Sequence, residues 1–207
     1  MENEPGLRER KKRQTREAIS GRATMLILER GFDAVTVAEI ARAAEVSEKT
    51  VFNYFPRKED LFLDRLAEFT EQVAAAVRAR DEGRSVAGAV QDLIADLVRE
   101  HHPISGYAEP AYASFWRVVI GSPALQARVR EYVQELEDAL AALCVESGEA
   151  DDLRARFAAA SIVGAYRTVY LDSARRILAG ERATVPDELI ARYARAFAAV
   201  ERGLEGF

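Results

Sequence analysis

Residues 36–61 hold two short helix patterns joined by a tight turn and closed by a proline. Thr36 and Glu39 form a T-x-x-E capping box, in which the hydroxyl accepts from an amide of the first turn and the glutamate reaches back. Apolar residues recur behind this cap at helical spacing, at Val37, Ile40, Ala41 and Ala44. Ser47 is suited to cap the second helix, which must end before Pro56 because proline disfavours a helical residue in front of it. The pattern predicts a helix-turn-helix.

In a helix-turn-helix the second helix enters the major groove of DNA and the first lies across the backbone. The second helix here has polar residues on one side, at Ser47, Glu48, Lys49, Thr50 and Asn53. We expect Val46, Val51 and Phe55 to pack inward. Two short helices with a capped turn also occur in all-α proteins that do not bind DNA. Spacing alone therefore leaves both interpretations open.

The net charge of −5 by itself argues against DNA binding, but the charges are distributed unevenly along the chain. Residues 1–60 hold twelve Lys or Arg against eleven Asp or Glu, so the acidic excess belongs to the remainder. Basic residues are densest in an N-terminal arm, at Arg8, Arg10, Lys11, Lys12, Arg13 and Arg16. The arm is expected to contact DNA phosphates or the minor groove, or else to be a solvated terminus.

The run from Val46 to Leu61, VSEKTVFNYFPRKEDL, closely resembles the DNA-binding domain of TetR/AcrR-family transcriptional repressors. Upstream pieces fall where that family has them, at Ala23 through Gly31-Phe32 and at Thr36-Val37-x-x-Ile40-Ala41. The match covers roughly residues 15–65 and keeps many positions in one register. Beyond it, the chain resembles the family only in length and helical character.

We assign DNA-binding roles to residues of the predicted helix-turn-helix and of the segment that follows it. The candidates are Thr36, Ser47, Lys49, Thr50, Asn53, Tyr54 and Lys58. We expect Thr36, Tyr54 and Lys58 to contact phosphates, and Lys49, Thr50 and Asn53 to contact base edges or the nearby backbone. Lys58 stands where the family has its backbone-contacting lysine, although a cation in a first helical turn opposes the helix dipole. The sequence departs from the family at Phe52, where many members have tyrosine.

Helical patterns ended by glycine and proline fill the rest of the chain, and no strand pattern is present. We predict an all-α fold of about nine helices. Residues 1–56 would form a three-helix DNA-binding head with its basic arm, and residues 57–207 a larger ligand-binding and dimerisation domain. The expected helices run over about 15–30, 36–44, 47–54, 57–80, 86–100, 109–119, 123–146, 151–179 and 186–203. The fourth would bridge the head to the rest.

Several classes of protein lack support in this sequence. It contains no glycine-rich phosphate loop, no G-x-S-x-G and no H-E-x-x-H, so we expect neither an enzyme nor a cofactor. The single cysteine, Cys144, excludes an internal disulfide and is typical of a reducing cytoplasm, and no zinc-ligand spacing exists. No apolar run is long enough to span a membrane, and the charged N-terminus lacks the apolar core of a signal peptide.

The densest aromatic patch lies at residues 107–117 and includes the single tryptophan. Tyr112, Phe115 and Trp116 would share a helical face, and His102 or Arg117 could supply polarity. The resemblance implies an effector pocket among the middle helices, but a plain core would give the same aromatic pattern. We leave both interpretations open for His102, Tyr112, Phe115 and Trp116.

Small residues mark the long helix expected from residue 151 onward and would let another helix approach closely. The resemblance implies a dimer built from the last two helices, with candidates Ala158, Ser161, Ile162, Ala165 and Val169. The leading hypothesis is a homodimeric repressor that a small-molecule effector releases from a pseudo-palindromic double-stranded DNA operator. The alternative is an all-α small-molecule-binding protein without operator binding.

Overall fold

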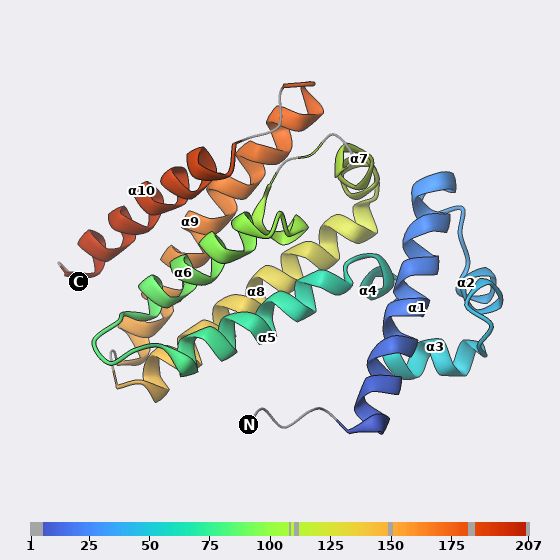
Figure 1. Cartoon of the computed structure of the whole chain (residues 1–207), viewed down its shortest axis with the longest axis horizontal. Coiled ribbons are helices and arrows are strands. Elements are labelled where there is room, and N and C mark those ends of the chain that lie inside the picture. Colours follow the sequence, from blue (N-terminus) through green and yellow to red (C-terminus); the bar gives the residue numbers. More distant parts are fainter. Residues whose placement is uncertain (1–5, 108, 110–111, 149–150, 182–184, 206–207) are drawn as a thin grey trace. The chain divides into compact units, whose positions relative to one another are not determined.

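The computed structural model describes residues 6–107, 109, 112–148, 151–181 and 185–205. Over these residues the regular structure is entirely helical, with ten α-helices and one 3-10 turn (Figure 1). The predicted all-α fold is therefore confirmed, with one helix more than expected. No described helix is long and apolar enough to cross a membrane.

The chain folds as two compact units. The first comprises Met1–Asp64 together with Val118–Arg128, and the second comprises Arg65–Arg117 together with Val129–Phe207. The sequence predicts a single boundary after residue 56. The chain instead leaves the first unit near Asp64 and returns to it for one short segment.

Four helices of the first unit form its N-terminal part: α1 (Leu7–Arg30), α2 (Val37–Ala43), α3 (Glu48–Tyr54) and α4 (Lys58–Phe62). α1 packs against α2 and α4, and α2 packs against α3 (Figure 1). Their core contains Ala23, Ile27, Phe32 and Ile40, together with Val51 and Phe55, which were expected to pack inward. Val46 was expected to pack inward as well but is only half-buried.

α1 begins at Leu7, eight residues before the expected start near residue 15. The Thr15 hydroxyl does not cap the helix, because it donates to the Lys11 carbonyl of the preceding turn (2.9 Å). The basic arm is thus the first part of the helix. Lysine, arginine and glutamine are good helix formers, and Arg13 pairs with Glu17 one turn on (3.6 Å).

The predicted bridge helix is broken. α4 ends at Phe62 and α5 (Asp64–Ala79) begins two residues later. Leu61, Phe62 and Leu63 are all buried, yet successive residues of a helix point about 100° apart. An unbroken helix would spread these three side chains over about 200°, and the break allows all of them to be buried.

The second unit is built from α5, α6 (Val86–Arg99), the 3-10 turn η1 (Pro103–Ser105) and later helices. These are α7 (Ala113–Gly121), α8 (Pro123–Glu146), α9 (Asp152–Leu178) and α10 (Pro186–Glu205). α10 packs along α6 and α9 (Figure 1). Ser85 and Asp151 cap α6 and α9 by accepting from backbone amides.

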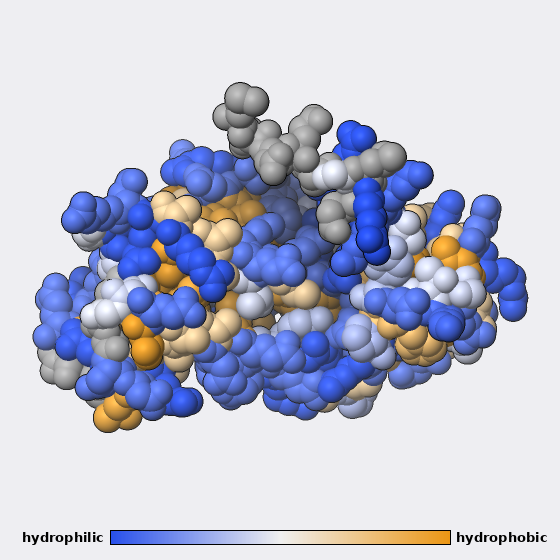
Figure 2. All heavy atoms as spheres, turned by 90° about the horizontal axis from the view of Figure 1, so that it is seen from below, coloured by the Kyte–Doolittle hydropathy of each residue, from blue (hydrophilic) through white to orange (hydrophobic). Residues whose placement is uncertain are grey.

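α7 begins at Ala113, later than the expected start near residue 109. Both α7 and α8 pass from one unit to the other without a break, at Arg117–Val118 and at Arg128–Val129. On the face drawn in Figure 2, exposed apolar residues form separate patches among hydrophilic ones.

Candidate nucleic-acid interface

The turn between α2 and α3 is a Schellman motif. The Val46 amide donates to the Ala41 carbonyl (2.9 Å), and the Glu45 amide donates to the Arg42 carbonyl (3.2 Å). Glu45 occupies the left-handed position of this motif with φ of 56°, where glycine is usual. A residue with a Cβ is strained there by roughly 1 kcal/mol. The turn therefore holds the angle between α2 and α3 through backbone hydrogen bonds.

The predicted capping box of α2 is present. The Thr36 amide donates to Glu39 Oε2 (2.8 Å), and the Glu39 amide donates to Thr36 Oγ1 (3.2 Å). Arg30 adds a bond from its guanidinium to Glu39 Oε1 (2.7 Å). The Thr36 backbone amide, Arg30 and the Thr36 hydroxyl together lower the pKa of Glu39 to about 2. The Thr36 hydroxyl already donates to Glu39, so a phosphate bond through it would compete with the cap.

Ser47 caps α3 as expected, because its hydroxyl accepts from the Thr50 amide (3.1 Å). The Ser47 and Thr50 hydroxyls also share a hydrogen bond (2.8 Å). Lys49, Phe52 and Asn53 are exposed and, at spacing i, i+3 and i+4, share the outer face of α3. Val51, on the inner side, is fully buried. α3 thus offers a cation, an aromatic ring and an amide to a partner outside the protein.

Lys58 is half-buried at the first turn of α4. Its ammonium donates to the Phe32 carbonyl (2.6 Å) and lies 4.2 Å from the centre of the Phe32 ring. Burial is the main reason why the pKa of Lys58 is lowered, and nearby Asp33, Glu59 and Glu39 oppose the shift. An ammonium has three donors, so the bond to Phe32 holds the group in place and leaves two for a phosphate.

A cleft of about 440 Å³ lies between the start of α1 and the C-terminal half of α3. It is lined by Arg8, Lys11, Lys12, Thr15, Thr50, Asn53 and Tyr54. Arg16 joins the same two helices, because its guanidinium donates to the Tyr54 carbonyl (3.0 Å) and lies over the Phe55 ring (4.3 Å). The cleft brings part of the basic arm beside three predicted DNA-binding residues. Charge in the sequence indicated the arm, but not which of its faces meets α3.

The predicted aromatic pocket residues lie in the second unit, where Trp116 contacts Phe115 and Tyr170 edge-on, at centroid distances of 5.6 and 5.0 Å. Tyr170 continues the aromatic cluster by stacking on Tyr166 (5.4 Å). Burial raises the pKa of Tyr170 and, more modestly, that of Tyr112. The sequence did not indicate Tyr166 or Tyr170, because they come from α9, far along the chain.

His102 is half-buried and caps η1, since its Nδ1 accepts from the Ile104 amide (3.3 Å). Its Nε2 lies 3.3 Å from Arg65 Nη1. Burial, followed by the charge of Arg65, lowers the pKa of His102. The Tyr166 hydroxyl donates to the Ile104 carbonyl (2.6 Å) and the Tyr193 hydroxyl donates to the Ser105 carbonyl (2.8 Å), so α9 and α10 each hold η1 by one hydrogen bond.

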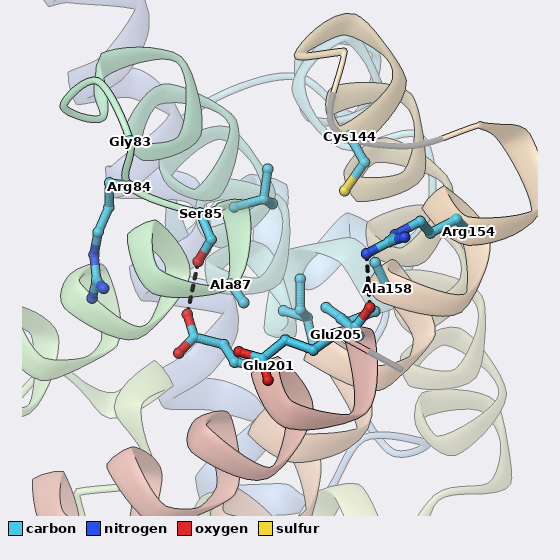
Figure 3. Close-up of a pocket in the computed structure, with 12 residues that line it drawn as sticks. Gly83, Arg84, Ser85, Ala87, Cys144, Arg154, Ala158, Glu201 and Glu205 are labelled. Atoms are coloured by element: carbon cyan, nitrogen blue, oxygen red, sulfur yellow. Dashed lines mark hydrogen bonds between the residues drawn. The ribbon is translucent and has the colours of Figure 1, made fainter. Parts of the chain in front are cut away.

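A separate cavity of about 400 Å³ opens in the second unit, lined by residues that no sequence motif indicated as a ligand site (Figure 3). Its walls are Gly83, Arg84, Ser85, Val86, Ala87, Cys144, Arg154, Ala158, Ile162, Glu201, Leu204 and Glu205. Ser85 donates to Glu201 (2.8 Å), and Arg154 donates to the Leu204 carbonyl (2.7 Å). Volumes of this size are typical of small-molecule sites. None of the four predicted pocket residues lines it.

The residues predicted for a dimer interface fall mostly inside the protomer. Ala158, Ile162 and Val169 belong to the core of the second unit, and Ser161 and Ala165 are half-buried. The opposite face of α9 is the accessible one: Leu153 is 67 % and Phe157 39 % exposed, and Ala160 and Gly164 continue the stripe. Both faces carry small and apolar residues, so the sequence could not distinguish them.

Over the described residues no group of three or more His, Cys, Asp or Glu is placed to hold a metal ion.

Comparison with known proteins gives consistent results. Residues 19–64 match the family model described as bacterial regulatory proteins, tetR family. The chain is 31 % identical over 171 residues to the HTH-type transcriptional regulator TcmR of Streptomyces glaucescens, covering 81 % of this chain and 74 % of TcmR.

Solved structures share the fold. A TetR-family regulator of Streptomyces coelicolor, SCO0857, superposes with a TM-score of 0.53 at 25 % identity, covering 97 % of this chain and 98 % of that one. NalD of Pseudomonas aeruginosa, a secondary repressor of the MexAB-OprM multidrug efflux pump, gives 0.54 at 22 % identity, with 92 % and 97 % covered.

Proposed function

Because this chain belongs to the TetR family of DNA-binding transcriptional regulators, a family without enzymatic activity, we propose that it is a homodimeric repressor released from its operator by a small molecule. The observation that carries the proposal is the outer face of α3, where Lys49, Phe52 and Asn53 project from a helix capped at Ser47. Repression follows if the operator overlaps a promoter, because the bound dimer then blocks access to it.

α3 would lie in the major groove, with phosphate contacts setting its register. Lys49 can donate to the acceptors of guanine and Asn53 can pair with adenine. Tyr54 and Lys58 supply phosphate contacts from the end of α3 and the start of α4. The hydroxyls of Thr36 and Ser47 already take part in helix caps, so a DNA contact through either hydroxyl would compete with its cap.

Operator binding is tested with DNA selected from a random-sequence library by the parent protein. We expect a pseudo-palindromic site with half-sites one helical turn, about 10 bp, or a multiple apart. Asn53→Ala should lose the base preference at one position of each half-site. Lys58→Ala should weaken binding to all sequences alike and flatten the slope of log K against log salt by about 0.9. Failure of the parent to select any DNA would leave the small-molecule-binding alternative.

We place the dimer contact on the accessible stripe of α9, together with the neighbouring face of α10. Ala160 and Gly164 are small, so a partner helix can approach closely, and Leu153 supplies apolar surface. On α10 the exposed positions Ala191, Arg195 and Ala199 recur at helical spacing. A two-fold arrangement of these helices would explain a palindromic operator.

The effector would bind in the second unit. The aromatic cluster of Phe115, Trp116 and Tyr170 offers ring faces for stacking, and the cavity of Figure 3 offers about 400 Å³ of space. A ligand shifts the DNA-binding equilibrium only by its differential affinity for two conformations. We expect α7 and α8 to transmit the change, since each runs unbroken from one unit to the other while α4 and α5 are interrupted at Leu63.

A metabolite panel distinguishes the two ligand sites. Binding at the aromatic cluster should alter the fluorescence of Trp116, the single tryptophan, and Trp116→Phe should weaken affinity measured by calorimetry. Binding in the cavity should leave the fluorescence unchanged and be weakened by Ala158→Leu, which fills the cavity. A compound that releases DNA yet responds to neither substitution would exclude both sites.

A further inference from the structure

We propose that the start of α1 and the C-terminal half of α3 form a clamp for a DNA phosphate, beside the outer face of α3 that reads the bases. The inference rests on the proposed function, because its ligand is the backbone of the DNA that α3 binds. It assigns the basic arm a defined partner and a defined face.

The spacing of the arm places its charges on one side. Arg8, Lys11, Lys12 and Thr15 recur at i, i+3, i+4 and i+7, which keeps them within about 60° to 100° of one another on a helix. All four line the cleft, whereas Arg10 and Arg13 lie on the far side of the same turns and do not. This is possible only because the arm is helical, since an irregular arm would not align these residues.

The opposite wall supplies neutral polar groups. Thr50, Asn53 and Tyr54 line it from α3 at spacing i, i+3 and i+4. No acidic residue is found among the described residues that line the cleft, so three cations meet there without a counter-charge in the wall. Cations combined with hydroxyl and amide donors are the groups that bind phosphate oxygens in protein–DNA complexes.

The cleft adjoins the surface that reads DNA. Asn53 is exposed on the outer face of α3 with Lys49 and Phe52, and it also lines the cleft. A helix lying in the major groove is bordered by the sugar-phosphate backbone on each side. With the outer face in the groove, the cleft would therefore receive the neighbouring backbone strand.

Arg16 holds the two walls in place without lining the cleft. Its guanidinium donates to the Tyr54 carbonyl at the end of α3 and covers the Phe55 ring, so α1 and α3 are joined one residue beyond Thr15. We assign Arg16 a positioning role. The walls are thus fixed before DNA arrives, which limits the ordering that binding requires.

The test compares two double variants with equal loss of charge and equal spacing. Arg8→Gln with Lys11→Gln removes two cations from the cleft wall, and Arg10→Gln with Arg13→Gln removes two from the opposite face. Glutamine preserves helix propensity, and circular dichroism confirms the fold. Affinity for the selected operator is measured over a series of salt concentrations.

We expect the cleft variant to lower the slope of log K against log salt by about 0.9 for each phosphate that it no longer neutralises, and the control to change it by much less. Its preference for operator over unrelated DNA should be unchanged, because phosphate contacts carry no sequence information. Ethylation of the phosphate beside each half-site should impair operator binding by the parent and the control but should not affect operator binding by the cleft variant.

Equal salt slopes for the two variants would overturn the clamp, since the arm would then act only as diffuse charge. An unchanged ethylation pattern in the cleft variant would also overturn it. Failure of the proposed function gives a different result, because the parent itself would then select no operator.

Discussion

Phe52 lies on the outer face of α3 with 48 % of its surface exposed, between the exposed Lys49 and Asn53. Tyrosine at this position could donate to a phosphate, but phenylalanine cannot. A ring in the major groove can instead contact the 5-methyl group of thymine. The departure from the family pattern thus changes what this position can recognise.

We predict that Phe52→Ala weakens operator binding and removes its dependence on one thymine methyl. Replacing that thymine by deoxyuridine should weaken DNA binding by the parent by about 0.5–1 kcal/mol, which is the contribution of one buried methyl group, and should leave DNA binding by Phe52→Ala unchanged. Titrations of both proteins on both DNAs form a double-mutant cycle. Equal losses for parent and variant at every thymine would show that the ring does not touch a methyl group.

Asp60 and Arg128 form a buried ion pair within the first unit. Arg128 Nε lies 2.7 Å from Asp60 Oδ1, and both side chains are only about a tenth exposed, 10 % for Asp60 and 11 % for Arg128. The pair joins α4 to the start of α8, two elements far apart in sequence. The sequence alone could not predict that these two residues form an ion pair.

Removing Arg128 takes this ion-pair partner away from the buried Asp60 carboxylate. We expect Arg128→Met to reduce the free energy of unfolding by about 3 kcal/mol, and Arg128→Met with Asp60→Leu to reduce it by less. Urea denaturation measures both. The prediction fails if the double variant is at least as unstable as the single one.

At the scale of elements, η1 depends on a histidine that must stay neutral on Nδ1 to accept from the Ile104 amide. Burial and Arg65 lower the pKa of His102, so the unfolded chain takes up a proton at a higher pH than the folded chain does. The unfolded state then binds more protons, and stability rises with pH. This contribution is complete above the ordinary histidine value of 6.5 and is lost as pH falls through the folded pKa.

We therefore predict a loss of stability on acidification below pH 6.5 that depends on His102. His102→Asn keeps a capping side chain and should flatten this dependence in urea unfolding followed on either side of that pH. His101→Asn is the matched control, because His101 is exposed and the chain has only two histidines. An identical pH dependence in the parent and His102→Asn would assign the effect to carboxylates instead.

At the scale of the whole molecule, we propose the accessible stripe of α9 as the surface through which two copies associate. Ala160 lies on this stripe, and Ala75 is an exposed alanine of α5 away from it. The buried stripe of the same helix, which includes Ile162, is already used by the core. A dimer contact through α9 would therefore use the side that the fold leaves open.

We expect the parent to have twice the chain mass of 22.9 kDa in light scattering after gel filtration. Ala160→Arg should convert it to the monomer and weaken operator binding, because each half-site would be bound independently. Ala75→Arg adds the same charge and should leave the dimer intact. A parent that elutes as a monomer, or a dimeric Ala160→Arg, would contradict this interface.

Local chemistry allowed much of this protein to be predicted from its sequence. The capping box of Thr36 and Glu39, the cap at Ser47 and the stop at Pro56 act within a few residues, so the bounds of α2 and α3 followed from them. The family resemblance then added Lys58 to the expected DNA contacts, and the structure places its ammonium against the Phe32 carbonyl.

Tertiary packing decided what local chemistry left open. Leu61, Phe62 and Leu63 break the expected bridge helix because all three are buried, and long-range contacts chose which of two similar faces of α9 faces the core. The cleft likewise exists because Arg16 joins α1 to α3 across 38 residues of sequence. Caps and turns can be read from neighbouring residues, whereas burial depends on surfaces that the folded chain brings together. The helix-turn-helix was therefore determined by the sequence, and the cleft proposed to bind phosphate beside it only by the fold.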